Sequence, residues 1–340
     1  MRIRIVSTLA VFVLCATVAN AQESRTVEHK ADGTVQETFS DGTVARGPIV
    51  NGKRHGKWII RFANGMVSEG PFVNDKKKGR WVERFPEGSV QEGLYVNDKK
   101  HGKWIIRFAS GTVQKGSYVN GKQHGKWIIR QADGTVAEGP IVSNKQHGQW
   151  VIRFPNGTVE TGSYVNGKKH GKWSIRAARG TVEEGPFVDG KKHGKWIIRF
   201  ANGTVSEGPF VNDKKKGWWV ERFPEGSVQE GLYVNDKKHG KWIIRFANGR
   251  IENGPYVNGK QHGSWIIRTA RGTVEEGPFV DGERHGKWSI LFAGGTVEEG
   301  PYVNGKKHGR WVSRYTDGRC TLIQFHQDQH EKESRCKKDP

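Results

Sequence analysis

Residues 184–206 read EGPFVDGKKHGKWIIRFANGTVS, and this 23-residue stretch decides the fold because it recurs from about residue 42 to residue 318. One Trp returns every 23 residues without an insertion or a deletion, and only Trp218 lies outside the series. The series is Trp58, Trp81, Trp104, Trp127, Trp150, Trp173, Trp196, Trp219, Trp242, Trp265, Trp288 and Trp311. A period of this length is typical of stacked units that bury their apolar side chains against one another.

Each unit contains two stretches with strand chemistry. KWIIRF at 195–200 and TVSEGPFV at 204–211 are rich in β-branched and aromatic residues. Asn202 and Gly203 lie between them and favour a hairpin turn, since both tolerate a positive φ. The stretch NGKKHG predicts a second, longer connection. The register stays open, because a three-residue turn would place Trp58 opposite Gly70, whereas a two-residue turn would exchange the faces.

The composition agrees with a thin repeat protein. Of 340 residues, 34% are hydrophobic, 46 are Gly and 13 are Trp. Gly brings no apolar area to bury, so a compact core of 340 residues would be hard to build. An aromatic fraction of 10% argues against disorder, and Gly lacks the three-residue period of collagen. We predict an all-β fold, an elongated single-layer antiparallel β-meander of about twelve 23-residue hairpin repeats.

The repeat resembles the MORN repeat, a 23-residue motif of spaced aromatic and Gly residues. The resemblance is carried by Glu69-Gly70-Pro71-Phe72-Val73, by Asp189-Gly190-Lys191-Lys192-His193-Gly194, and by the YVNGKKHG runs that start at Tyr164 and Tyr302. Trp58 and its equivalents stand where the common motif has Gly, which is similar to a bacterial, antitoxin-like variant. The resemblance implies a single-layer β-sheet. Eukaryotic members act as scaffolds, dimerise, or are credited with binding acidic phospholipids.

The N-terminus has the pattern of a secretory signal peptide. Arg2 and Arg4 precede an apolar stretch, and Ala19-Asn20-Ala21 forms a cleavage site. An uncleaved anchor is the alternative, but about 14 apolar residues fall short of the roughly 20 that span a bilayer. A lipoprotein would need a small residue where Leu14 precedes Cys15. We expect cleavage after Ala21 and a secreted, periplasmic or cell-envelope location.

We predict that the chain divides into four segments. Residues 1–21 are the signal peptide, 22–41 a lead-in or cap, 42–318 the repeat array and 319–340 a C-terminal cap. Removal of the signal peptide lowers the formal charge from +21 to +19, since Arg2 and Arg4 are lost. The mature chain is therefore strongly basic.

Basic residues gather in the NGKKHGK stretch and predict a cationic rim on one edge of the sheet. The residues assigned to this rim are Lys53, Arg54, Lys57, Lys76, Lys77, Lys99, Lys100, Lys103, Lys122, Lys168, Lys169, Lys191, Lys192, Lys214, Lys215, Lys237, Lys238, Lys306 and Lys307. A rim of this kind binds polyanions, such as an anionic membrane surface or an acidic polymer. The alternative is a solvated edge whose Lys residues prevent strand pairing.

Two other periodic rows have alternative interpretations. His recurs at ten positions from His55 to His308, for which we predict loop packing, with titration near pH 6 as the alternative. Neighbouring copies would be roughly 9.6 Å apart, too far to share a zinc ion. The Trp ladder predicts the packed face of the sheet. Its alternative is a sugar-stacking platform, as in a carbohydrate- or cell-wall-binding surface protein.

The tail after Gly318 differs from the repeats. Cys320, His326, His330 and Cys336 could ligate zinc, but two Cys in an exported chain more often form a disulfide. We predict a Cys320–Cys336 disulfide that fastens the C-terminal cap, and no metal site.

No catalytic motif stands out, and identical repeats offer no unique pocket. We therefore expect a non-enzymatic scaffold without cofactor or small-molecule substrate. Its expected partners are an anionic membrane surface or acidic polymer, or a protein that includes a second copy of the chain. Export argues against nucleic acid.

Overall fold

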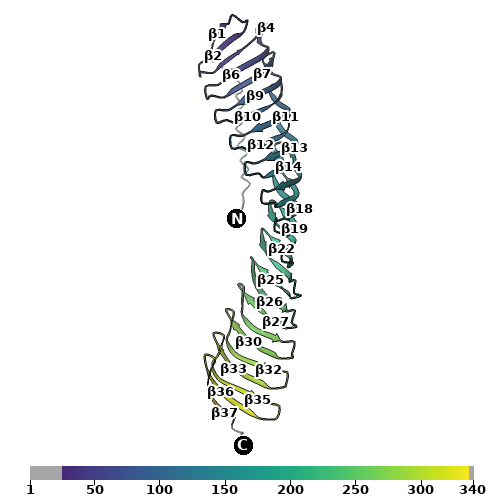
Figure 1. Cartoon of the computed structure of the whole chain (residues 1–340), viewed down its shortest axis with the longest axis vertical. Helices are drawn as coiled ribbons and strands as arrows, with labels where there is room; N and C mark the ends of the chain where they lie inside the picture. The colour runs from purple at the N-terminus through teal and green to yellow at the C-terminus, as the bar shows by residue number, and fades with distance from the viewer. Residues whose placement is uncertain (1–24, 337–340) are drawn as a thin grey trace. The chain divides into compact units, whose positions relative to one another are not determined.

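A computed structural model describes residues 25–336, so the predicted signal peptide and its cleavage site lie outside the described residues. The chain divides into two units, residues 1–122 and 123–340. In both, successive antiparallel hairpins lie side by side (Figure 1). The described residues form no helix, and so none that is long and apolar enough to cross a membrane.

In the first unit, the strands are β1 (Arg25–His29), β2 (Val35–Phe39), β3 (Val44–Gly47), β4 (Ile49–Val50), β5 (Lys53–Arg54), β6 (Gly56–Arg61), β7 (Val67–Val73), β8 (Lys76–Lys77), β9 (Gly79–Arg84), β10 (Val90–Val96), β11 (Lys99–Arg107) and β12 (Val113–Val119).

In the second unit, the strands are β13 (Lys122–Arg130, within the unit from Gln123), β14 (Val136–Val142), β15 (Lys145–Gln146), β16 (Gly148–Arg153), β17 (Val159–Val165), β18 (Lys168–Arg176), β19 (Val182–Val188), β20 (Lys191–Lys192), β21 (Gly194–Arg199), β22 (Val205–Val211), β23 (Lys214–Lys215), β24 (Gly217–Arg222), β25 (Val228–Val234), β26 (Lys237–Arg245), β27 (Ile251–Val257), β28 (Lys260–Gln261), β29 (Gly263–Arg268), β30 (Val274–Val280), β31 (Glu283–Arg284), β32 (Gly286–Leu291), β33 (Val297–Val303), β34 (Lys306–Lys307), β35 (Gly309–Arg314), β36 (Cys320–His326) and β37 (Gln329–Arg335).

The first turn of each repeat has three residues and sets the register. The Phe62 amide donates to the Met66 carbonyl, and the Gly65 amide donates to the Phe62 carbonyl. Gly65 has a φ of +83°, which Gly adopts without strain. Arg61 therefore pairs with Val67, and Trp58 lies opposite Gly70. Of the two registers that the sequence allowed, the structure has the one with the three-residue turn.

The second turn is shorter than predicted. Asp189 and Gly190 alone, with φ of 49° and 82°, connect Val188 to Lys191. A two-residue turn with positive φ at both positions matches the twist of a hairpin. Lys191 and Lys192 therefore lie in a strand rather than in a loop, and the prediction of a long NGKKHG connection is wrong.

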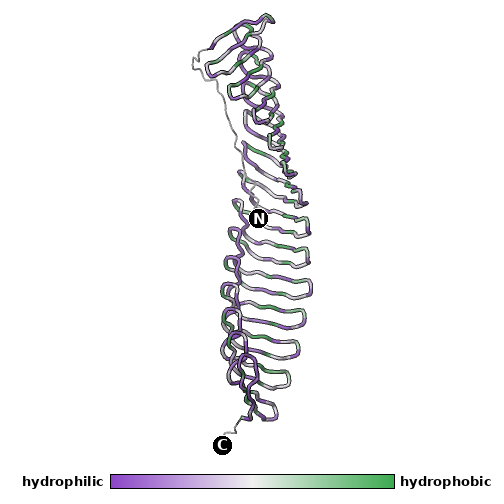
Figure 2. Tube along the Cα trace, turned by 60° about the vertical axis from the view of Figure 1, so that its left-hand side comes forward, coloured by the Kyte–Doolittle hydropathy of each residue, from purple (hydrophilic) through white to green (hydrophobic). Residues whose placement is uncertain are grey.

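The alternation of the strands separates two faces. The Trp face holds Trp196, the aromatic Phe187 and Phe210, and Gly185, whereas the Arg face holds Arg199. Hydrophilic and hydrophobic positions consequently alternate along the trace (Figure 2). An added Cβ at Gly185 would lie 2.3 Å from the Trp196 ring, so only Gly fits beneath the indole.

Edge-to-face aromatic contacts run along the Trp face from Trp58 to Tyr118 in the first unit and from Trp150 to Phe325 in the second, where Ile141 takes the aromatic position between Trp127 and Trp150. Trp196 meets Phe187 and Phe210 edge to face, with ring centroids 5.2 and 6.0 Å apart, and its Nε1 donates to the Pro186 carbonyl. Such aromatic pairs contribute about 0.5–1.5 kcal/mol each beyond the burial of their area. All twelve ladder Trp residues are only 0–1% exposed. One layer of strands thus obtains a core from its own aromatic face.

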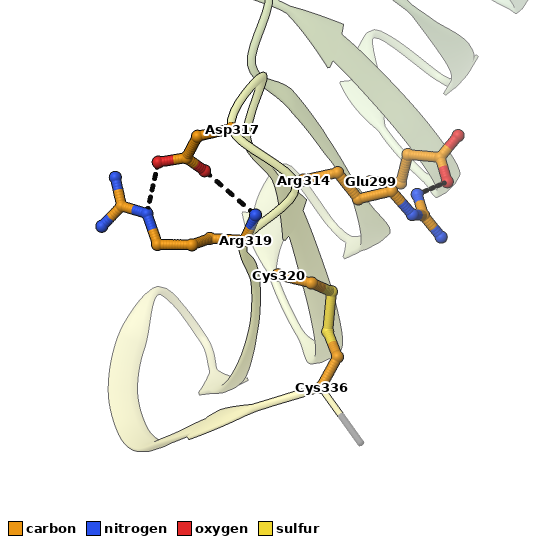
Figure 3. Close-up of a disulfide and its surroundings, with 6 residues drawn as sticks. All are labelled: Glu299, Arg314, Asp317, Arg319, Cys320 and Cys336. Carbon is orange, nitrogen blue, oxygen red and sulfur yellow. Dashed lines mark hydrogen bonds and ion pairs between the residues drawn. A yellow bond between two sulfur atoms is a disulfide. The ribbon is translucent and has the colours of Figure 1, made fainter. Parts of the chain in front are cut away.

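Both ends of the described chain continue the strand pairing. At the N-terminus, β1 pairs with β2 inside the predicted lead-in. At the C-terminus, β36 pairs with β35, and β37 adds a last strand whose residues are all exposed. Cys320 and Cys336 are joined by a disulfide (Figure 3). The tail is therefore a further hairpin that extends the sheet, rather than a lid over its last strand. Its charged residues oppose edge pairing.

Candidate functional site

The two basic residues after each short turn lie on opposite faces of the sheet. Lys215 pairs with Phe210 on the Trp face, whereas Lys214 pairs with Val211 on the Arg face. Consecutive strand residues point to opposite faces, so this separation follows directly from the two-residue turn. We call the second basic residue of each pair the ladder cation and the first the rim Lys.

The ladder cations are part of the packed structure. Lys215 Nζ lies 4.0 Å from the centroid of the Trp219 ring, 3.0 Å from Glu221 Oε1 and 3.3 Å from Ser206 Oγ. Lys77 repeats this arrangement over Trp81, with Glu83 as its acid. A cation over an indole is attracted by the ring quadrupole, most strongly where water is excluded.

Glu83, the acid beneath Lys77, stays ionised despite its burial. Burial alone would raise the pKa of Glu83, but the charges of Lys77 and Lys100 and hydrogen bonds from Lys77 and Tyr95 outweigh it. The pKa of Glu83 therefore lies below its ordinary value. Burial also lowers the pKa of Lys100, although the charge of Glu83 opposes this. These groups form a satisfied internal network.

Eight residues predicted for the rim are in fact ladder cations. These are Arg54, Lys77, Lys100, Lys169, Lys192, Lys215, Lys238 and Lys307. The prediction that they line an exposed edge is wrong, because each is committed to an aromatic ring.

The rim Lys residues are exposed, as a surface site requires. They include the predicted Lys53, Lys76, Lys99, Lys122, Lys168, Lys191, Lys214, Lys237 and Lys306, and also Lys145 and Lys260, which the prediction left out. Between residues 25 and 336, Lys168 alone among them has an ion pair, at 3.9 Å from Asp189. Exposed Val residues lie beside them, as Val188 does beside Lys191.

Lys57 and Lys103 lie farther along the strand, on the Arg face. Lys57 forms an ion pair with Glu69, and Arg84 approaches the same carboxylate. The prediction had grouped both Lys residues with the rim. They instead belong to a second cationic row, in mid-strand.

The Arg face also carries an Arg row that the sequence interpretation missed. Its members are Arg61, Arg84, Arg107, Arg130, Arg153, Arg176, Arg199, Arg222, Arg245, Arg268 and Arg314. Their 23-residue period was a readable signal.

A Glu joins neighbouring strands on this face. Glu207 accepts a hydrogen bond from Arg222 at 2.9 Å and lies 3.3 Å from Lys195 Nζ. The hydrogen bond from Arg222 is the main reason that the pKa of Glu207 lies below its ordinary value. A repeat of this pattern carries three basic side chains on the Arg face, the rim Lys, the mid-strand Lys and the Arg, against one Glu, so the face is positive.

Burial of the Trp ladder excludes its use as a sugar platform. Stacking on a sugar requires an exposed ring face, whereas the twelve indoles are 0–1% exposed. The alternative of a carbohydrate-binding Trp ladder is therefore wrong.

Seven of the ten His residues predicted to pack are exposed, whereas His55, His101 and His308 are half-buried. The side chains of His124, His147 and His193 are exposed. The backbone amide, rather than the imidazole, holds the residue in place. The His193 amide, for example, donates to the Pro186 carbonyl. No group of three or more His, Cys, Asp or Glu suited to a metal occurs in the described part of the chain. In the tail, Cys320 and Cys336 bind each other instead.

The solved structures to which this chain is similar belong to differently named proteins. A mutant TCP10 domain of Danio rerio CPAP is 15% identical, with a TM-score of 0.23, and the match covers 68% of this chain and 93% of that chain. The G-box domain of the microcephaly protein CPAP is 16% identical over 66% and 100%, with a TM-score of 0.25. Streptogramin B lyase is 12% identical over 89% and 92%, with a TM-score of 0.15. No curated protein matches the chain.

The family comparison agrees with the resemblance seen in the sequence. The MORN repeat model matches five segments, residues 92–113, 115–126, 161–172, 184–205 and 230–249. The bacterial, antitoxin-like subtype stays a prediction. With its strands paired as hairpins in each unit, the chain carries MORN repeats, which are recognised at five positions.

Proposed function

We propose that the chain is a non-enzymatic, exported scaffold whose rim binds an anionic envelope component, an acidic lipid or an acidic polymer. The observation that carries the proposal is the rim Lys, which recurs from Lys53 to Lys306 in every repeat except the one with Glu283 at this position. It is exposed, and it lies on the Arg face beside an exposed Val, as Lys191 does beside Val188. A basic residue close to an anionic membrane contributes about 1 kcal/mol, and repetition adds such contacts without requiring a pocket.

Export is the second part of the proposal. It is supported by the signal-like pattern of residues 1–21 and by the Cys320–Cys336 disulfide, a bond that persists in oxidising compartments. Expression with the leader in a secreting host should yield a mature chain that begins at Gln22. Mass spectrometry without reduction should find no free thiol in it. An intact leader would contradict export, and two free thiols would contradict the bridge.

Vesicle binding tests the rim directly. The full mature chain should sediment with phosphatidylcholine vesicles that contain phosphatidylglycerol and should not sediment with phosphatidylcholine alone. Binding should weaken steeply with salt, because exposed charges are screened. Replacing Lys168, Lys191, Lys214, Lys237 and Lys306 by Gln should weaken it about tenfold or more.

The matched control replaces the same five Lys residues by Arg, which keeps the charge and should keep the binding. Equal binding by the Gln and Arg variants would contradict a role for the rim. An acidic polysaccharide assayed beside the vesicles distinguishes polymer from lipid. A protein partner, or a second copy of the chain, would be indicated by salt-resistant crosslinking without retention on either anion.

A further inference from the structure

One position on the Arg face of the second unit departs from the repeat. Ser174 stands where most repeats have Ile or Val, such as Ile197 and Val220. Thr161, which pairs with Ser174 across the strands, stands where most repeats have Glu, such as Glu184. Two large side chains are thus replaced by small hydroxyl residues at adjoining positions.

The two replacements open a hollow. It has a volume of about 500 Å³, and Gln149, Thr161, Lys172, Ser174, Arg176 and Glu184 are among its lining residues. Ser174 Oγ is buried and has no hydrogen-bond partner among the described residues. A buried hydroxyl without a partner costs about 1–3 kcal/mol, so a ligand that bonds it recovers this loss.

The replacement at Thr161 leaves Arg176 without an acid, and Lys172 also lacks an ion pair in the described part of the chain, although Glu184, the acid at its repeat position, is retained. In other repeats, the Glu at the position of Thr161 pairs with the Arg fifteen residues later, as Glu207 does with Arg222. Arg176 holds that Arg position here but faces Thr161. Within residues 25–336, neither Arg176 nor Lys172 has an ion pair, while Glu184 is bonded to Arg199.

Other repeats vary these positions without combining the changes. Asn253 also replaces Glu, but Ile266 still fills the adjoining position. Ser289 also replaces Ile, but Glu276 is retained beside it, and Leu291 stands in place of Arg. The small residues, the buried hydroxyl and the unpaired Arg occur together only in the hollow, as far as the described repeats extend.

We propose that this hollow binds a phosphate monoester on a small polar carrier such as a sugar. An Arg fork matches two phosphate oxygens, and Lys172 supplies a second charge for a dianion. Ser174 and Thr161 add two hydroxyl donors to those of Arg176 and Lys172. This number of donors suits the three terminal oxygens of a phosphate monoester better than the two oxygens of a carboxylate. The volume exceeds that of a bare phosphate, and the Gln149 amide can bond the hydroxyls of the carrier. This site goes beyond the rim and does not depend on it.

Isothermal titration of the full mature chain tests the site, with glucose 1-phosphate as the main probe. Inorganic phosphate, glucuronate and glucose are the comparison arms. Glucose 1-phosphate should bind saturably at one site per chain and more tightly than inorganic phosphate. Glucuronate should bind at least tenfold more weakly, and glucose should not bind.

Two variants restore the ordinary repeat and should fold normally. Ser174→Ile fills the hollow, and Thr161→Glu gives Arg176 its missing partner, so each should weaken binding of glucose 1-phosphate at least tenfold. Arg222→Gln, in an unmodified repeat, should leave it unchanged. Loss in all three variants would indicate diffuse attraction to the Arg face and would overturn the proposal, as would glucuronate binding as tightly as glucose 1-phosphate. The rim Gln variant should keep this binding, which separates the site from the rim proposal.

Discussion

Residues 214–222 present three pairs of neighbours with opposite surroundings. Lys214 is exposed at the rim, while Lys215 lies over the ring of Trp219. Trp218 is 46% exposed, while Trp219 is 0% exposed. The comparison teaches that residue type does not decide the role of a side chain in this sheet, because the face on which it lies does.

The third pair shows the same division among charges. Glu221 bonds Lys215 on the Trp face, and Arg222 bonds Glu207 on the Arg face. The Trp face is shielded from water and acts as the core, whereas the Arg face is solvated. Substitutions at neighbouring positions should therefore separate structural effects from surface effects.

The two Trp residues should show the largest contrast. Trp219→Ala leaves a cavity in the aromatic stack and should lower the free energy of unfolding by about 3–5 kcal/mol. Trp218→Ala, its neighbour on the exposed face, should change it by less than about 0.5 kcal/mol. Urea unfolding followed by circular dichroism measures both. Similar losses in the two variants would contradict the assignment of the core to one face.

Lys214 and Lys215 should show the next largest contrast in the free energy of unfolding. Lys215→Met removes the charge that balances buried Glu221 and should destabilise the chain by about 1–3 kcal/mol. Lys214→Met should be within about 0.5 kcal/mol of the wild type. The same unfolding assay applies, at neutral pH and moderate salt. A larger loss from Lys214→Met would place the structural cation at the rim.

Acid should weaken the Trp face through its carboxylates. Burial would raise the pKa of Glu221, but the charge of Lys215 and hydrogen bonds from Lys215 and Gln229 bring it below the ordinary value. The unfolded chain then binds this proton more readily, so stability from Glu221 is complete above the unfolded pKa of about 4.3 and is lost as the pH falls through the lower folded pKa.

Unfolding measured between neutral pH and pH 3 checks this. Glu221→Gln should be less stable at neutral pH and should depend less on pH below about 4.3 than the wild type. An unchanged acid dependence would show that Glu221 does not contribute to it.

The fold could be predicted from the sequence because the strands and turns of each repeat are determined by residues that lie close together in the chain. The period of Trp196 and the turn residues Asn202 and Gly203 predicted the hairpins. The separation of Lys191 from Lys192 was not accessible, since it depends on whether the turn after Val188 has two residues or more. That turn length was misjudged because the whole NGKKHG stretch is polar and looks like a loop.

The residues of the candidate sites could be predicted from the sequence to different degrees. The rim Lys residues were predicted except for Lys145 and Lys260, and the Arg row was overlooked although Arg199 recurs with the same period. The hollow needed the register, because Thr161 and Ser174 are thirteen residues apart and only the strand pairing brings them together. Exceptions to a repeat are visible in sequence, but their adjacency is a property of the fold.

The smallest contrast concerns the ion pairs of the two faces. A double-mutant cycle with Glu207→Gln and Arg222→Met should give a coupling of about 0.2–1 kcal/mol, because both groups contact water. This coupling should disappear near 1 M salt, where the screening length is about 3 Å. The cycle with Lys215→Met and Glu221→Gln should retain most of its coupling there, since those groups are less exposed. Equal salt sensitivity of the two cycles would mean that the Trp face is as solvated as the Arg face, and the distinction between a core face and a solvated face would then fail.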